Sequence, residues 1–84
     1  MKCDRNDILD IIRSINIELS VDELDPTLAL GEQGVDSLDM MNIFFGIEER
    51  FGVNIDENAL EEKDWDTVDA IAASVDVLVR EKAR

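Results

Sequence analysis

Apolar side chains recur at helical spacing in three stretches of the chain: from Asp4 or Asn6 to Leu19, from Ser37 to Phe51, and from Thr67 to Lys82. In each stretch they fall three or four residues apart, so they would line one face of a helix. Gly52 follows the second stretch and suits a helix end. The buried stripes predicted for the first and last helices are Ile8, Ile11, Ile12, Ile15 and Leu19, and Val68, Ile71, Ala72, Val75, Leu78 and Val79.

The connections between these helices differ in length. Residues 20–36 include Pro26 and two glycines and are predicted as a long loop, which three leucines pin to the helices: Leu24, Leu28 and Leu30. A short helix is predicted over Glu57–Glu62, with Asp56 as its cap, and Asp66 or Thr67 would cap the last helix. The expected fold is all-α: a four-helix bundle of three longer helices and a short third one, in a single domain spanning residues 1–84.

The second predicted helix carries two separate apolar strips. With about 100° between successive residues, five side chains gather into a core stripe: Met40, Ile43, Phe44, Ile47 and Phe51. The residues expected on the solvent-exposed face are Asp39, Asn42, Gly46, Glu49 and Arg50. Leu38, Met41 and Phe45 form a second strip about 40–100° from Ser37. Either neighbouring helices wrap far enough to bury this strip, or it is a partner-binding surface with a charged rim.

Charge is distributed as unevenly as hydrophobicity. The net charge is −13 over 84 residues, which argues against direct binding of DNA or RNA because phosphate contacts need lysine and arginine. Between Arg13 and Arg50 there is no basic residue, whereas the interval holds nine acidic ones: Glu18, Asp22, Glu23, Asp25, Glu32, Asp36, Asp39, Glu48 and Glu49. Such a one-signed surface either serves solubility or steers a basic partner toward it.

The sequence also bounds location and chemistry. It has no run of about 18 apolar residues that could span a membrane. Its first seven residues lack the apolar core of a signal peptide, so we expect a cytoplasmic protein. The one cysteine, Cys3, is expected to be an ordinary free thiol at a frayed end. No metal site is expected, because the acidic run Asp56–Asp66 lacks the central glycine of a calcium-binding EF-hand loop.

Ser37 lies between two aspartates at the start of the second helix, and three interpretations compete for it. It could cap the helix, although Asp36 could do so equally well. It could be a catalytic nucleophile, but the chain contains no histidine to act as its base and no Gly-x-Ser-x-Gly turn. It could be a modification site, because an enzyme acting in trans brings its own base and metal. The sequence favours the third interpretation, and no enzymatic activity is expected.

The segment Gly34-Val35-Asp36-Ser37-Leu38 resembles the signature of the acyl carrier proteins, which lies at the start of the second helix of a four-helix bundle. The resemblance extends over nearly the whole chain. It includes the first amphipathic helix, the long acidic loop, the Ile47–Phe51 end of the second helix, and the Thr67-Val68 start of the last one. The chain is similar to a free-standing carrier of bacterial type, and we expect a monomer.

This resemblance implies that Ser37 carries a covalent 4′-phosphopantetheine arm, transferred from coenzyme A by a phosphopantetheinyl transferase. The thiol of the arm would hold acyl groups as thioesters and present them to basic-surfaced acyl-transfer, synthase or ligase enzymes of fatty-acid, lipid or polyketide-type biosynthesis. The resemblance also implies shelter for the acyl chain near Phe45 and Ile55. The implied docking residues are Asp36, Leu38, Asp39, Met41, Phe45, Glu48 and Glu49.

Departures from the family pattern concern the cargo. Glu32-Gln33-Gly34 stands where typical fatty-acid carriers have Asp-Leu-Gly, and the Phe44-Phe45 pair is bulkier than usual. These differences suggest a specialised carrier. Two alternatives remain open: a carrier of aminoacyl or peptidyl groups with the same fold, and an acidic interaction protein that is not modified.

Overall fold

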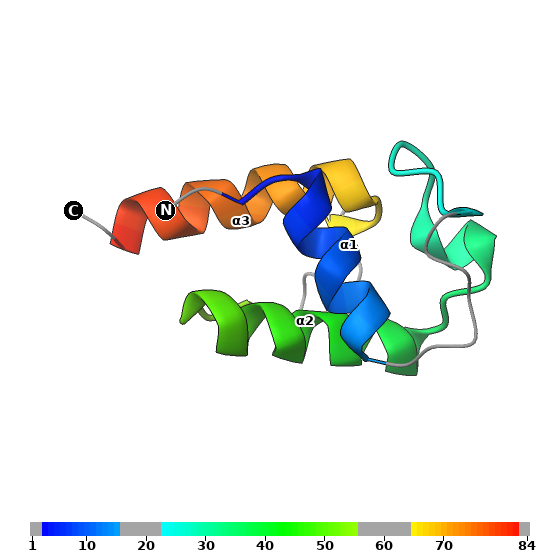
Figure 1. Ribbon diagram of the computed structural model, residues 1–84, viewed down its shortest axis with the longest axis horizontal. Coiled ribbons are helices and arrows are strands. Elements are labelled where there is room, and N and C mark those ends of the chain that lie inside the picture. The colour runs from blue at the N-terminus through cyan, green and yellow to red at the C-terminus, as the bar shows by residue number, and fades with distance from the viewer. Residues whose placement is uncertain (1–2, 16–22, 56–64, 83–84) are drawn as a thin grey trace.

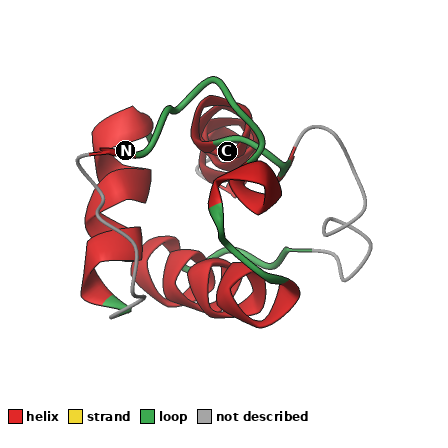
Figure 2. Ribbon diagram, turned by 90° about the vertical axis from the view of Figure 1, so that its right-hand side faces the viewer, coloured by secondary structure: helices red, strands yellow, loops and turns green. Residues whose placement is uncertain are grey.

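The computed structural model describes residues 3–15, 23–55 and 65–82, which form three α-helices and a short 3₁₀ helix. The α-helices are α1 (Arg5–Ser14), α2 (Ser37–Phe51) and α3 (Val68–Lys82), and the 3₁₀ helix is η2 (Leu30–Gln33). In Figure 1, α2 and α3 run in the same direction, one above the other, and α1 crosses and packs against both. Viewed along the long axis in Figure 2, α1 stands to one side of this pair.

The predicted all-α class is confirmed for the described residues, whose one extended contact is an isolated antiparallel bridge between Ala29 and Thr67. The bounds predicted for α2 are confirmed, and Gly52 ends it in the left-handed conformation with φ of 65°. Thr67 caps α3, because its hydroxyl accepts the N–H of Ala70 at 2.9 Å. The predicted short helix over Glu57–Glu62 and its cap Asp56 lie outside the described residues. Among the described helices, none is both long and apolar enough to cross a membrane.

Helix α1 begins as predicted but ends earlier. At its start, Asp4 and Asp7 form a reciprocal capping box, in which each carboxylate accepts the other residue's backbone N–H at 3.1 Å. The end predicted at Leu19 is wrong, because the helix ends at Ser14. There the Ser14 hydroxyl donates to the carbonyl of Ile11 at 2.7 Å, and the N–H of Ile15 bonds back only three residues, to Ile12. These bonds tighten the last turn and compete with continuation of the helix.

The core is formed by one stripe from each helix. All five residues predicted for the α2 stripe are buried, as are five of the six predicted for α3, with Leu78 partly buried. In α1, Ile8, Ile11 and Ile12 are buried and Ile15 is partly buried, whereas Leu19 lies outside the described residues. The stripes therefore meet in one hydrophobic cluster, which the helical spacing alone predicts.

Two predictions about the chain outside the helices are wrong. Leu24 and Leu30 are buried, but Leu28 is 49% exposed, because it ends a tight turn in which its N–H bonds to the carbonyl of Asp25.

Cys3 is not at a frayed end: it is buried, and its N–H donates to the carboxylate of Asp76 at 3.1 Å. Burial, reinforced by nearby carboxylates, raises the pKa of the Cys3 thiol to about 12, so the free thiol is an inert part of the core at neutral pH.

The helical period predicts Gly46 on the solvent-exposed face of α2, but α1 crosses α2 at this position. A Cβ atom built on Gly46 would lie 2.9 Å from Cγ2 of Ile11. This methyl group is attached to the branched Cβ atom of Ile11, and rotation about χ1 is restricted for such a side chain in a helix. The absence of a side chain at Gly46 therefore lets the two helices approach closely.

We predict that Gly46→Ala lowers the free energy of unfolding by about 1 kcal/mol, because the cost of overpacking exceeds the helix-propensity gain. The measurement is urea unfolding followed by circular dichroism. In an Ile11→Ala background, where the opposing methyl group is gone, the same change should instead be stabilising by about 1 kcal/mol. A gain in stability in the parent background would contradict the proposed close approach.

Candidate functional site

Ser37 is the first residue of α2, and its side chain is exposed. Asp36 is the N-cap residue, because its carboxylate accepts the N–H of Asp39 at 2.8 Å. Capping therefore does not account for Ser37. Within the part of the chain that the structure describes, no hydrogen bond engages the Ser37 hydroxyl. The hydroxyl is accessible at the positive end of a helix, where a phosphate group would be electrostatically favoured.

The backbone before Ser37 turns sharply so that buried and exposed residues follow one another closely. Gly34 has a φ of 96°, a left-handed conformation that a residue with a side chain rarely adopts. Val35 is buried, and its N–H donates to the carbonyl of Leu30 at 3.1 Å. Val35 thus anchors the entry to α2, and the chain emerges at the surface two residues later with Ser37.

A hollow of about 280 Å³ adjoins Ser37. Its walls come from η2 and the residue before it, from the two residues between Gly34 and α2, from the first turn of α2 and from the chain before α3. The lining residues are Ala29, Gly31, Glu32, Val35, Asp36, Ser37, Met40 and Asp66. The serine therefore lies at the edge of a concave surface formed by segments that are distant in sequence.

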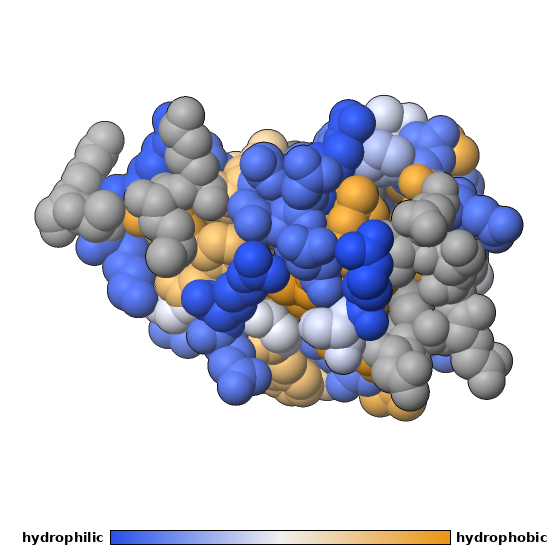
Figure 3. All heavy atoms as spheres, viewed as in Figure 1, coloured by the Kyte–Doolittle hydropathy of each residue, from blue (hydrophilic) through white to orange (hydrophobic). Residues whose placement is uncertain are grey.

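The second apolar strip of α2 is exposed, as one of the two sequence interpretations required. Leu38 is 67% exposed, Met41 41% and Phe45 58%, although the other face of the same helix is fully packed. On the face that Figure 3 shows, apolar residues reach the surface along the lower edge, over α2. The ring of Phe45 thus lies at the surface, whereas Phe44 is buried and packs edge-on against Trp65 with ring centroids 5.6 Å apart.

The four acidic residues predicted beside the strip are not equivalent. Asp36 and Glu49 are exposed, whereas Glu48 is half-buried, as is Asp39, which the helical period predicts on the solvent side. Glu48 is held inward because its carboxylate accepts the N–H of Ile55 at 2.9 Å. This bond satisfies a backbone donor just beyond α2. Glu48 therefore has a structural role in addition to its charge.

The basic residues of the described chain leave these acids uncompensated. Each is engaged elsewhere: Arg5 with Asp69, Arg13 with Asp10, Arg50 with Asp7, Arg80 with Asp76, and Lys82 with the carbonyl of Gly52. Within the described ranges no ion pair reaches the four acidic residues of α2 and its cap. The face that carries Ser37 and the exposed apolar strip is consequently negative.

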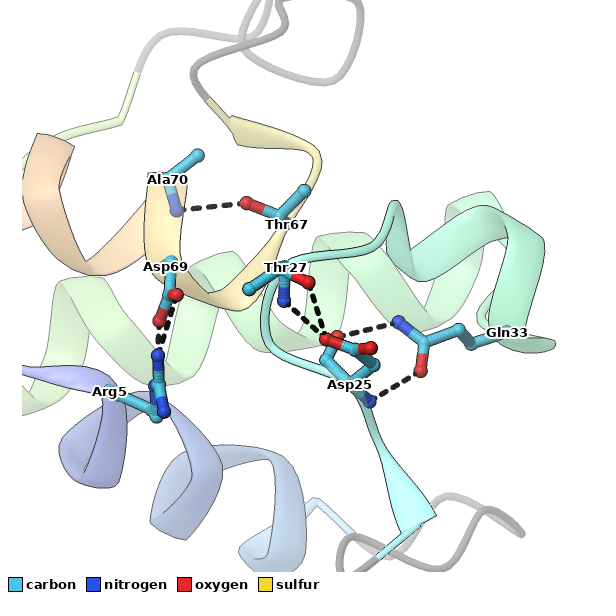
Figure 4. A network of polar contacts seen from close by, with 7 residues as sticks. All are labelled: Arg5, Asp25, Thr27, Gln33, Thr67, Asp69 and Ala70. Carbon is cyan, nitrogen blue, oxygen red and sulfur yellow. Dashed lines mark hydrogen bonds and ion pairs between the residues drawn. The ribbon is translucent and has the colours of Figure 1, made fainter.

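The loop before Ser37 is held against the start of α3, which the sequence did not indicate. The N–H of Leu30 donates to the carbonyl of Asp66 at 2.7 Å, and the N–H of Asp69 donates to the carbonyl of Pro26 at 2.9 Å. The side chain of Asp69 in turn forms a two-bond ion pair with Arg5 of α1, with both distances 2.8 Å (Figure 4). This contact lowers the pKa of Asp69 below its usual range. Three separate segments are thereby joined at one end of the molecule.

Comparison with known proteins agrees with this geometry. A family model described as "Phosphopantetheine attachment site" matches residues 6–75, a range that contains Ser37. A curated protein of Mycoplasma genitalium, "Acyl carrier protein homolog", is 38% identical over 53 residues. That match covers 63% of this chain and 63% of the relative, so the chain spans just under two thirds of the relative's length.

The different environments of Glu48 and Glu49 generate a prediction about stability. Glu48→Ala should lower the free energy of unfolding by about 1–2 kcal/mol, because it leaves the N–H of Ile55 without its acceptor. The neighbouring Glu49→Ala removes the same charge from an exposed site and should change stability by less than about 0.5 kcal/mol. Urea unfolding of the two variants compares them directly. Equal effects would show that the bond between Glu48 and Ile55 contributes nothing measurable.

Proposed function

This chain belongs to the acyl carrier protein family, and from that premise we propose that Ser37 is the residue to which 4′-phosphopantetheine is attached. The observation that carries the proposal is the exposed Ser37 hydroxyl, without a partner in the described chain, at the start of a capped helix and beside an exposed apolar strip. Members of the family are carriers rather than catalysts. The absence of histidine from the sequence is consistent with that role.

The attachment chemistry requires little from this chain. A phosphopantetheinyl transferase removes the proton of the Ser37 hydroxyl, and the oxygen attacks the phosphorus of coenzyme A that bears the pantetheine. A phosphodiester bond forms between the Ser37 oxygen and the pantetheine phosphate. The phosphoanhydride bond of coenzyme A breaks, and adenosine 3′,5′-bisphosphate leaves. The carrier's contribution is to expose the oxygen and to bind the transferase in the correct orientation.

Partner enzymes are proposed to dock on α2. The exposed apolar strip of Leu38, Met41 and Phe45 supplies an apolar centre, and the acids around it supply a negative rim. A matching partner has an apolar patch bordered by lysine and arginine. Transferases and the synthase, ligase and acyl-transfer enzymes that use the loaded arm would share this surface. Methionine suits such shared use because its flexible side chain can repack against different partners.

The proposed cargo is an acyl group held as a thioester on the thiol of the arm, for use in fatty-acid, lipid or polyketide-type biosynthesis. The acidic rim favours acyl-processing partners over aminoacyl ones. The departures at Glu32-Gln33 and Phe44-Phe45 favour a specialised carrier. Mass analysis of the thioester on protein isolated from its own cell would distinguish acyl from aminoacyl cargo.

The attachment itself is tested by intact mass after incubation with coenzyme A, magnesium and a broad-specificity transferase. We expect the parent protein to gain the mass of one phosphopantetheine and Ser37→Ala to gain none. Circular dichroism of the variant should match that of the parent, because Ser37 is exposed and does not cap α2. An unmodified parent, with a transferase that modifies a control carrier, would rule out the proposal and favour an unmodified acidic interaction protein.

The docking surface is tested with Phe45→Ala, which we expect to raise the KM of the transferase for the carrier by about tenfold, as truncation of an interface anchor typically does. The free energy of unfolding should change by less than about 0.5 kcal/mol because the ring is largely exposed. Val77→Ala is the matched control, since Val77 is 53% exposed but lies on α3. An equal rise in KM for both variants would argue against a specific docking strip on α2.

A further inference from the structure

The side chain of Gln33, at the end of η2, uses both its donor and its acceptor atoms within the loop that precedes Ser37. Its amide oxygen accepts the N–H of Asp25 at 2.7 Å. Its amide nitrogen donates to the carbonyl of Asp25 at 2.9 Å and to that of Leu28 at 3.1 Å. Figure 4 shows the amide facing Asp25 across the loop. One side chain thus bridges two backbone segments eight residues apart.

The segment that Gln33 holds is itself a closed turn. The carboxylate of Asp25 accepts the N–H of Thr27 at 2.8 Å and its hydroxyl at 2.6 Å (Figure 4). These bonds lower the pKa of Asp25 below its usual range. The carbonyl of Pro26, within the same turn, accepts the N–H of Asp69 from α3. Gln33 is therefore fastened to a turn that the rest of the fold holds in place.

From Gln33 the connection to Ser37 is short and firmly packed. The carbonyl of Leu30, at the start of η2, accepts the N–H of both Gly34 and Val35. Val35 is buried, Asp36 caps α2, and Ser37 follows as the first helical residue. These bonds and the burial of Val35 fix the short connection between Gln33 and Ser37. A displacement of η2 would therefore move Val35 and the first turn of α2.

We propose that Gln33 is a positioning residue for the transfer reaction: its amide fixes η2 against the turn at Asp25–Leu28 and thereby sets the place of the Ser37 hydroxyl. The inference rests on the proposed attachment at Ser37 and goes beyond it, because Gln33 does not belong to the docking strip. An apolar side chain at this position could not form these three hydrogen bonds.

The test variant is Gln33→Met, which keeps the length of the side chain and removes all three hydrogen bonds. With the apo-protein, coenzyme A and a broad-specificity transferase, we expect kcat to fall by about tenfold, since a small misplacement of a reacting atom has an effect of this order or larger. The KM for the carrier should stay within about twofold, because the exposed apolar strip and its acids are unchanged. Amide hydrogen exchange should accelerate at Asp25 and Val35 but not in α3.

Two further variants separate positioning from a general loss of stability. Gln33→Glu keeps the acceptor and loses both donors, so it should also lower kcat, and it serves if the methionine variant does not fold. Val79→Ala weakens the core at the far end of α3, away from the loop, and should leave kcat unchanged at temperatures where the protein stays folded. A kcat lowered equally by Val79→Ala would assign the effect to stability and overturn the inference.

The result for the parent protein distinguishes the two proposals. If the parent accepts no arm, the proposed function fails and the inference fails with it. If the parent is modified and Gln33→Met keeps the parental kcat while the Asp25 amide loses its protection, only the inference fails. Loss of kcat with an unchanged KM in both Gln33 variants would support it.

Discussion

Burial of the core stripe of α2 is the constraint that determines which residues of this helix face solvent. Ile43 and Ile47 have no exposed surface, and full burial of such a side chain contributes about 1.5–3 kcal/mol. Because these residues must face the hydrophobic core, the rotation of α2 about its own axis is determined. Leu38, Met41 and Phe45 then face away from the core, since the helical period places them on another side. The same packing that stabilises the fold therefore presents the exposed apolar strip.

The second constraint is the attachment of the loop before Ser37 to the start of α3. Backbone bonds from Leu30 to Asp66 and from Asp69 to Pro26 satisfy polar groups that a long connection would otherwise leave to water. The ion pair between Arg5 and Asp69 brings α1 into the same junction. Both side chains of that pair are substantially exposed, so its contribution to stability is small. The pair orients the junction, whereas the backbone bonds and the buried residues Leu30 and Val35 hold it.

Charge and packing are divided between different faces of the molecule. The cations of the described chain are engaged on α1, on α3 or at the end of α2, where they pair with acids or cap a carbonyl. The acids near Ser37 have no such partners in the described ranges. A surface of this kind repels its own copies and attracts basic proteins, which supports the proposed docking of basic partners on α2. Glu48 is an exception, because its carboxylate is partly committed to the backbone at Ile55.

Helical periodicity along the chain is sufficient to predict the helical class, the bounds of α2, the residues of its core stripe and the separation of the second apolar strip. These features follow from the helical period, which is a local property of the chain, and from the turn chemistry of Gly52. Ser37 could be singled out for a similar reason: the absence of histidine and the adjacent motif are visible without a structure. Features that depend on contacts between distant residues could not be predicted in this way. Cys3 is buried in the core and its N–H bonds to Asp76, 73 positions away, and Gly46 packs closely because α1 crosses α2 there. The inward position of Glu48 and the hydrogen bonds of the Gln33 amide likewise depend on backbone groups that only the folded chain brings within reach.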